Sequence, residues 1–140
     1  MPQTEFELEV RTAAREAIRA KVSEVVLPGF QGERGVLAGH ENFIGLLGTG
    51  VLKLVRGGDD YWYVVGSGVF EVRDGKLVIL TDTFEEPKQI DTTGSAARIS
   101  SIEAKLATGS QLDRENELLA KELKRERARV EAHRRTELVN

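Results

Sequence analysis

Residues 51–80 read VLKLVRGGDDYWYVVGSGVFEVRDGKLVIL, and this stretch decides the fold of the first part of the chain. The runs at 51–55 and 61–65 are rich in strand-forming residues, and Gly-Gly-Asp-Asp at 57–60 predicts a hairpin loop between them. Asp74-Gly75 predicts a second hairpin, because both residue types accept the positive φ of a two-residue turn. Short strands at this spacing predict a β-sandwich or a flattened barrel.

Strand patterns continue toward the N-terminus. Phe6, Leu8 and Val10 alternate with glutamates, which is the pattern of a strand with one solvated face. A β-branched run from Val22 to Leu27 predicts another strand, and we expect it to end at Pro28-Gly29.

Glycine and proline divide the chain into two parts. Twelve of the fourteen glycines and all three prolines precede residue 90. Glycine is disfavoured inside a helix by about 1 kcal/mol relative to alanine, so the glycine-poor remainder predicts helix. We therefore expect a mainly β, then α chain, with a β-sandwich domain over 1–88 and an antiparallel helical hairpin over 89–140.

The sequence predicts the N-cap, the apolar stripe and the C-terminal end of a first helix. Asp91 or Thr92 can cap it, since their side-chain oxygens accept hydrogen bonds from unpaired amides of the first turn. Thr108-Gly109-Ser110 ends it. Its apolar stripe consists of Ile99, Ile102 and Leu106.

A second helix is expected from about Gln111 to near Leu138. Its inward positions between Leu123 and Val130 hold Glu126 and Arg127, so the stripe is interrupted and we expect the hairpin to dock weakly and to open. The expected stripe is Leu112, Leu119, Leu123 and Val130.

Composition excludes several classes of protein. The chain has no cysteine, and therefore no disulfide and no Cys-type zinc site. No run approaches the roughly 20 apolar residues of a membrane span, and the start is unlike a signal peptide, so we expect membrane association only through another protein. The net charge of −3 hides a basic stretch at 121–135, which is either a solvated helix face or a surface for an acidic partner or nucleic acid.

The inventory of reactive residues does not support an enzyme. His40 and His133 are the only histidines and lie far apart in sequence, so no paired metal ligands are expected. Ser67 lies in Gly66-Ser67-Gly68, which lacks the full nucleophile-elbow pattern and predicts a tight β crossing. Neither a catalytic nor a metal site is predicted.

The segment VVLPGFQGERGVLAGH at 25–40 holds four glycines that shape its path. We expect Phe30, Gln31, Glu33 and Arg34 to be displayed at its tip as a contact surface. An ordinary surface hairpin is the alternative interpretation of the same pattern.

This segment, together with YWYVVGSGVFEVRDGKLVILTDT at 61–83 and Ile90-Asp91, resembles the epsilon subunit of bacterial rotary ATP synthases, called delta in mitochondria. The resemblance rests on the ordered elements L-P-G, G-E-x-G, G-H and G-x-x-E-V. It implies a ten-stranded β-sandwich followed by a two-helix hairpin. It also implies a central-stalk subunit without an active site, which carries proton-driven rotation of the c-ring and gamma subunit to the catalytic head.

The resemblance also implies partners and a location. Phe30, Gln31, Glu33 and Arg34 would face the c-ring, and Thr12, His40 and Gly45 would lie toward gamma. The complex would place the chain peripherally on the cytoplasmic side of the bacterial plasma membrane. The basic second helix would meet the catalytic alpha/beta subunits and inhibit ATP hydrolysis through Lys121, Lys124, Arg125, Arg127, Arg129, Arg134 and Arg135.

Two departures from the family concern its regulatory ATP and one turn. Ile90-Asp91 fit the start of the pattern Ile/Leu-Asp-x-x-Arg-Ala, but Gly94 and Ser95 replace its arginine and alanine. Neutral side chains cannot replace a bidentate guanidinium contact to phosphate, so no bound cofactor is expected. Asn42 stands where the family often has proline.

Two other classes stay open. A free-standing nucleotide-sensing module would hold its ligand between sandwich and hairpin. An RNA-binding β-barrel with a basic tail is less well supported, because the β part is acidic and Tyr61, Trp62 and Tyr63 adjoin a hairpin.

Overall fold

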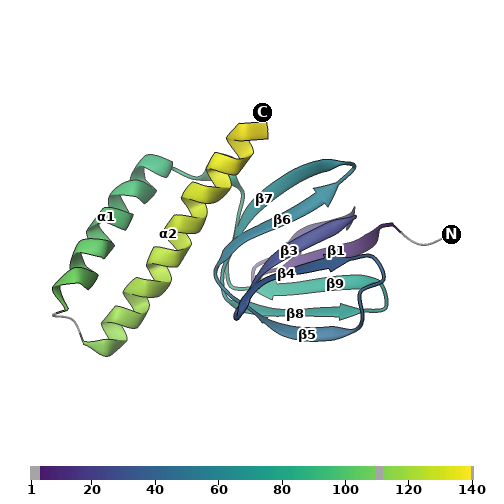
Figure 1. The fold of residues 1–140 in the computed structure, drawn as a ribbon, viewed down its shortest axis with the longest axis horizontal. Coiled ribbons are helices and arrows are strands. Elements are labelled where there is room, and N and C mark those ends of the chain that lie inside the picture. Colours follow the sequence, from purple (N-terminus) through teal and green to yellow (C-terminus); the bar gives the residue numbers. More distant parts are fainter. Residues whose placement is uncertain (1–3, 110–111, 140) are drawn as a thin grey trace.

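The computed structural model describes residues 4–109 and 112–139. Ten strands precede a short 3-10 turn, η1 (Pro87–Gln89), and two helices, α1 (Thr92–Thr108) and α2 (Asp113–Val139) (Figure 1). The strands are β1 (Phe6–Arg11), β2 (Glu16–Val22), β3 (Glu24–Gly29), β4 (Gly32–Leu37), β5 (Phe43–Leu47), β6 (Gly50–Arg56), β7 (Asp59–Val65), β8 (Gly68–Arg73), β9 (Lys76–Thr81) and β10 (Phe84–Glu85).

The strands form a folded sheet in the order β10-β7-β6-β3-β5-β8-β9-β1-β2, and β4 pairs with β3 outside this path. All pairings are antiparallel except that of β1 with β9. The bend brings the two halves of the sheet face to face. The expected ten-stranded sandwich followed by a helical hairpin is confirmed.

Both predicted hairpins form. Gly57 and Gly58 have φ of 60° and 82°, and Asp74 and Gly75 have 49° and 80°, as a two-residue turn with positive φ at both positions requires. The first loop is shorter than expected, because Asp59 already pairs with Arg56 at the start of β7.

The strand expected over 22–27 was placed wrongly. A break at Ser23 separates β2 from β3, and β3 continues through Pro28 to Gly29. Proline has no amide hydrogen to donate, but the Pro28 carbonyl accepts a hydrogen bond from the Gly48 amide at 2.7 Å, so this position remains held in the fold.

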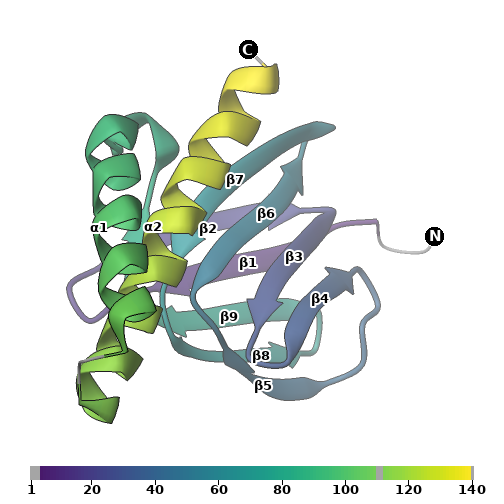
Figure 2. The ribbon, with the colours of Figure 1, turned by 60° about the vertical axis from the view of Figure 1, so that its left-hand side comes forward.

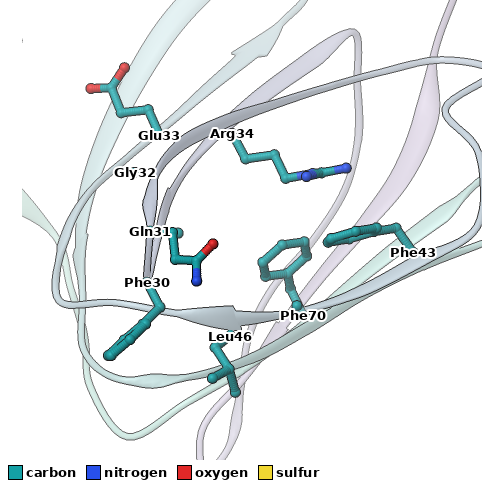
Figure 3. A pocket seen from close by; sticks show the side chains of 10 residues that line it. Phe30, Gln31, Gly32, Glu33, Arg34, Phe43, Leu46 and Phe70 are labelled. Atoms are coloured by element: carbon teal, nitrogen blue, oxygen red, sulfur yellow. The ribbon is translucent and has the colours of Figure 1, made fainter.

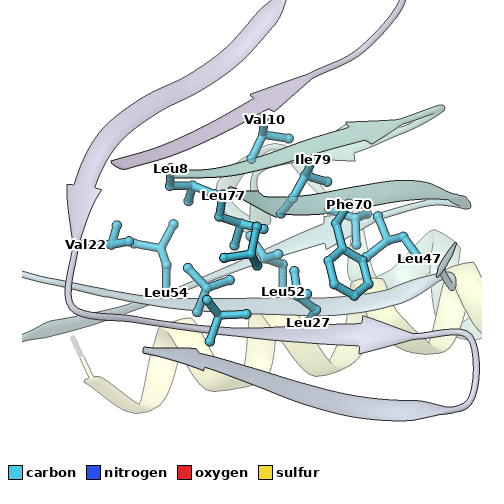
Figure 4. Close-up of a cluster of buried hydrophobic side chains, with 14 of the residues drawn as sticks. Leu8, Val10, Val22, Leu27, Leu47, Leu52, Leu54, Phe70, Leu77 and Ile79 are labelled. Atoms are coloured by element: carbon cyan, nitrogen blue, oxygen red, sulfur yellow. The ribbon is translucent and has the colours of Figure 1, made fainter. Parts of the chain in front are cut away.

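The core lies between the two halves of the sheet (Figure 4). Alternate residues of each strand point into it, as the period of two predicts. Its buried members are Phe6, Leu8, Val10, Val22, Val25, Leu27, Val36, Leu47, Leu52, Leu54, Val65, Phe70, Val72, Leu77 and Ile79.

The caps of α1 follow the prediction. The Asp91 carboxylate accepts hydrogen bonds from the amides of Thr93 (3.1 Å) and Gly94 (3.2 Å), and Gly109 ends the helix with a φ of 62°. The hairpin then returns along α2, which lies between α1 and the sheet and packs on β6 and β7 (Figures 1 and 2).

The face of α2 that meets the sheet differs from the expected leucine stripe. Ala128 and Ala132 are buried against Val64 of β7, with Trp62 and Ile90 beside them. Small side chains let the helix approach the sheet closely. Leu123 is buried as expected, Leu119 and Val130 are half-buried, and Leu112 is exposed and precedes the helix.

Of the two charged residues expected to face inward, only Glu126 does so. It is 1% exposed. Arg127 is exposed, and its guanidinium pairs with Glu103 of α1 at 2.9 Å, so the inward placement of Arg127 was wrong. One residue along a helix turns a side chain by about 100°, which places neighbours such as these on different faces.

Candidate functional site

Among residues 4–109 and 112–139, no group of histidine, cysteine or acidic side chains is arranged to hold a metal ion. Neither helix combines the length and the apolar character that a bilayer span requires. The surfaces of the molecule are therefore the places to look for function.

The turn between β3 and β4 presents an apolar ring. Phe30 and Gln31 form the turn between Gly29 and Gly32, and a Cβ on Gly29 would lie 2.6 Å from the Gly32 carbonyl oxygen. The Phe30 amide donates to the Leu46 carbonyl at 2.9 Å, which ties the turn to β5. The Phe30 side chain is 73% exposed, so a fixed backbone displays it.

Arg34 is not displayed with the other three residues of this segment. Side chains alternate along β4, so Arg34 shares the inward face with buried Val36, while Glu33 points outward and is exposed. The Arg34 Cζ lies 3.6 Å from the centroid of the Phe43 ring, and Phe43 stacks on Phe70 at 5.8 Å between centroids (Figure 3). The Arg34 Nε is buried and has no hydrogen-bond partner among the described residues.

A cleft of about 360 Å³ opens beside this stack, between the β3–β4 turn and β5. The Phe70 ring packs directly on the Gly45 backbone in this cleft, since a Cβ on Gly45 would lie 2.5 Å from Phe70 Cζ. The cleft thus joins Gly45, expected to lie toward gamma, to residues expected to face the c-ring. The lining residues include Phe30, Gln31, Glu33, Arg34, Phe43, Gly45 and Phe70.

Thr12 and His40 lie at opposite ends of the sheet. β1 and β5 run in the same direction, since β1 is parallel to β9 and both β5 and β9 are antiparallel to β8. Thr12 follows the end of β1, whereas His40 precedes the start of β5. The two residues and Gly45 therefore do not form one cluster.

The outer face of β5, β8 and β9 carries an exposed apolar surface that the sequence analysis missed. Leu46, Val69 and Leu80 lie side by side in register, and Ile44 lies next along β5. Ile44 is 69% exposed and Leu46 is 58% exposed. We call these four residues the β5 apolar face. The unbroken apolar run Phe-Ile-Gly-Leu-Leu at 43–47 is the signal that would have revealed it, because a solvated strand alternates with polar residues.

Charged side chains from three elements meet where the hairpin joins the sandwich. Arg129 of α2 donates to both carboxylate oxygens of Glu85 on β10, each at 2.6 Å, and to Glu126 Oε1 at 2.6 Å. Arg98 of α1 reaches the same Glu126 oxygen at 3.1 Å. We call Glu85, Arg98, Glu126 and Arg129 the junction cluster.

The buried carboxylate of the junction cluster stays ionised. Burial raises the pKa of Glu126, but the neighbouring Ser95 hydroxyl and the guanidinium groups of Arg98 and Arg129 lower it by more, so the pKa lies below its ordinary value. Ile90 and Asp91, the nucleotide candidates, line a cleft of about 320 Å³ beside this cluster.

Most of the basic stretch on α2 is already paired in this conformation. Lys124 is the only one of its seven cations without an ion pair among the described residues. The pairs are Lys121 with Asp82, Arg125 and Arg129 with Glu85, Arg127 with Glu103, and Arg134 and Arg135 with Glu131. Three of these cations, Lys121, Arg125 and Arg129, pair with the sandwich residues Asp82 and Glu85, so their pairs depend on the docked position of the hairpin.

The aromatic residues near the β6–β7 hairpin do not form a stacking platform. Tyr63 stacks on Phe84 at 5.0 Å between ring centroids, and Trp62 packs under α2. Rings engaged in this way are not available to stack on RNA bases.

Comparison with known proteins decides the family. The family described as "ATP synthase, Delta/Epsilon chain, beta-sandwich domain" matches residues 5–87. The chain belongs to the ATP synthase delta/epsilon family. A curated relative, the ATP synthase epsilon chain of Bradyrhizobium sp. (strain BTAi1), is 37% identical over 81% of this chain and 86% of its own. The relative of the same name from Solibacter usitatus is 40% identical over 71% of this chain and 73% of its own.

Solved structures share the fold of this delta/epsilon-family chain. A chain of the Euglena gracilis mitochondrial ATP synthase (OSCP/F1/c-ring, rotational state 1) matches with a TM-score of 0.79 at 24% identity, over 90% of this chain and 79% of that one. A chain of the Tetrahymena thermophila mitochondrial ATP synthase central stalk and c-ring matches with a TM-score of 0.52 at 17% identity, over 62% and 69%. As a family member, the chain is a non-catalytic, epsilon-type central-stalk subunit of an F-type ATP synthase.

Proposed function

We propose that this epsilon-type subunit couples rotation of the c-ring and gamma to the catalytic head of a proton-translocating ATP synthase, and that its helical hairpin restrains ATP hydrolysis. The observation that carries the proposal is that the sandwich offers two contact surfaces, the β5 apolar face and the β3–β4 turn, while the hairpin packs on different strands, β6 and β7. A subunit built this way can hold the rotor with its sandwich and still move its helices.

Gamma is the proposed occupant of the β5 apolar face. Charged residues make up 31% of the chain, yet this face exposes apolar side chains next to one another. Contiguous exposed apolar surface is a feature of protein–protein interfaces. Gly45 lies within β5, and Thr12 directly follows Arg11, the partner of Leu80. We therefore propose that gamma contacts this face as well as Thr12, which adjoins it. Gly45 lies on the opposite face of β5 and His40 beyond the other end of that strand, so their proposed gamma contacts would be separate from this one.

The c-ring is the proposed partner of the β3–β4 turn. Phe30 offers an exposed ring, Gln31 and Glu33 offer polar groups, and the turn is tied to β5 by the Phe30–Leu46 hydrogen bond. Because the turn is held to the sheet, it would pass torque from the c-ring to the sandwich with little deformation of its own. Through this contact the subunit would lie peripherally at the cytoplasmic side of the bacterial plasma membrane.

The inhibitory role is proposed for the extended state of the hairpin. Six of the seven basic residues at 121–135 are paired internally while the hairpin is docked. Undocking would free Arg125 and Arg129 from Glu85 and Lys121 from Asp82, and so expose positive charge to the catalytic alpha/beta subunits.

Co-purification tests the assembly. Tagged full-length chain should retain gamma from the same cell, and a chain ending before Asp91 should retain gamma equally well but allow faster ATP hydrolysis by the complex. Absence of gamma from the full-length preparation contradicts the assignment of partners. Unchanged hydrolysis after truncation contradicts the inhibitory role alone.

A free-standing nucleotide sensor is not favoured by any contact in the structure. The guanidinium groups beside Ile90 and Asp91 are already bound by Glu85 and Glu126.

A further inference from the structure

The junction cluster connects three elements: Arg129 joins α2 to β10 through Glu85, and Glu126 joins α2 to α1 through Arg98. Contacts run from Glu85 on β10 to Arg129 on α2, from Arg129 to Glu126, and from Glu126 to Arg98 on α1. Glu126 Oε1 receives both arginines, while Oε2 is buried without a hydrogen-bond partner among the described residues. The carboxylate is therefore enclosed by protein, and both of its ion-pair partners belong to this junction.

The apolar contact between hairpin and sandwich uses small side chains on α2. Ala128 and Ala132 pack against Val64, with Val51, Trp62 and Ile90 beside them. The ion pair of Glu85 with Arg129, whose side chains are 21% and 16% exposed, adds to this contact in holding α2 on the sheet.

The regulatory ATP implied by the family does not fit this junction. Its two guanidinium groups are matched by the Glu85 and Glu126 carboxylates, and Asp91 adds a third negative charge whose Oδ1 caps α1. A polyphosphate entering the cleft would meet carboxylates and no unpaired cation, and Gly94 offers it no side-chain donor.

We infer that Glu126 is a built-in anion that fills the arginine site between the helices and holds the hairpin docked without any bound ligand. Its connection of Arg98 to Arg129 replaces the connection that an external anion would provide. Glu126 also accepts a hydrogen bond from Arg129 at 2.6 Å and so fixes the guanidinium that binds Glu85 of the sandwich. Loss of the Glu126 charge removes this anchor from the largely buried Arg129 side chain and leaves Arg98 without an ion pair among the described residues. The regulatory meaning of this inference rests on the proposed function, but docking itself is a property of the isolated chain.

The chain carries its own reporter of docking. Trp62 is the only tryptophan and packs under α2 beside Ala128 and Ala132. Quenching of its fluorescence by acrylamide therefore measures the fraction of undocked hairpin. The chain also has no cysteine, so Arg73→Cys on the sandwich and Leu118→Cys on α2 allow two spin labels to report the distance between the two parts.

Glu126→Gln is compared with Glu131→Gln in the isolated full-length chain. Glu131 lies on the same helix, and among the described residues its ion pairs are with Arg134 and Arg135 of that helix, so it matches the charge change without joining two elements. We expect Glu126→Gln to raise the undocked fraction roughly tenfold or more, to expose Trp62 to acrylamide and to add a longer distance between the labels. Glu131→Gln should leave both readouts at the parent values. Far-UV circular dichroism confirms that the helices and sandwich persist in both variants.

Two results overturn the inference. One is a Glu126→Gln variant whose Trp62 quenching and label distances equal those of the parent. The other is a parent chain whose hairpin docks only after ATP is added, or which binds ATP with micromolar affinity by calorimetry. Because no partner subunit is present, neither result bears on the gamma co-purification that tests the proposed function.

Discussion

The guanidinium of Arg34 lies over the ring of Phe43, with 3.6 Å between Cζ and the ring centroid, on the inward side of β4. No carboxylate lies within ion-pair distance of Arg34 among the described residues, so an aromatic face takes the place of a counter-ion at this edge of the sandwich. The arrangement allows a charged side chain of the edge strand β4 to pack against an aromatic ring of β5.

Replacing Arg34 should therefore weaken the sandwich itself. Arg34→Gln removes the cation–π contact, and we expect the free energy of unfolding in urea to fall by about 0.5 to 2 kcal/mol. Arg73→Gln removes the same charge from an exposed position in the β8–β9 hairpin and should change stability by less than about 0.5 kcal/mol. Equal losses in the two variants would mean that net charge, and not the Phe43 contact, sets the effect.

The second prediction concerns Gly45, where the neighbouring rings leave no room for a side chain. A methyl group there would lie 2.5 Å from Phe70 Cζ and 2.9 Å from a ring carbon of Phe43, so both rings must shift. We expect Gly45→Ala to lower the free energy of unfolding by about 1 to 3 kcal/mol, as overpacking does. Unfolding of the parent and the Gly45→Ala variant in urea measures this difference in free energy.

Gly35→Ala is the matched control for Gly45→Ala. No heavy atom lies within 4 Å of the Cβ position of Gly35, which is also in a strand at the edge of the sandwich. It should be neutral, or stabilising by up to about 1 kcal/mol, because alanine restricts the unfolded chain. A Gly45→Ala variant as stable as Gly35→Ala contradicts the crowding at Phe70.

The proposed gamma surface is tested by Leu80→Asp. Leu80 is exposed in the row with Leu46 and Val69, so a carboxylate there should leave the fold intact but weaken gamma binding roughly tenfold or more, since the interface would bury an unpaired charge. Leu138→Asp makes the same change at an exposed position near the end of α2 and should not affect gamma binding. Isothermal titration against gamma compares the two, and equal affinities remove the β5 apolar face from the proposed interface.

The turns were predictable from the sequence because their cause is local. Gly57-Gly58 and Asp74-Gly75 need positive φ at consecutive residues, and few residue types allow it. Asp91 could be assigned as a cap for the same reason. The number of strands and the family came from the resemblance, which depends on the order of short motifs and not on local physics.

The contacts that join distant elements were not predictable. Arg129 meets Glu85 across 44 positions in the sequence, and nothing in the period of α2 identifies that partner. The same helix packs on the sheet through Ala128 and Ala132, because small residues allow close approach, whereas hydrophobic periodicity favours leucines. The inward turn of Arg34 depends on the aromatic pair that faces it from β5 and β8.

The pH dependence of docking follows from Glu126. Its pKa lies below the ordinary value of 4.5 because the neighbouring Ser95 hydroxyl and the charges of Arg98 and Arg129 outweigh burial. Ser95 and Arg98 lie on α1 and Arg129 lies on α2, so the ionised form of Glu126 stabilises the packed helix pair that holds Arg129 against Glu85. This stabilisation is present above the ordinary pKa of 4.5 and is lost as the pH falls through the lowered pKa. Glu85, the other carboxylate of the junction cluster, accepts hydrogen bonds from Arg129.

Trp62 quenching should therefore show the hairpin docked at neutral pH and released in acid, once the pH has fallen below 4.5 and through the lowered pKa of Glu126. The sandwich has an acid-sensitive group of its own, since a hydrogen bond from Lys76 and the charge of Arg11 hold the pKa of Glu9 below its ordinary value. Far-UV circular dichroism must accordingly show intact strands at each pH that is compared. In Glu126→Gln the docked fraction should be low and nearly independent of pH over this range. A parent chain that stays docked until the sandwich itself unfolds would assign the acid response to Glu9 and remove Glu126 from the control of docking.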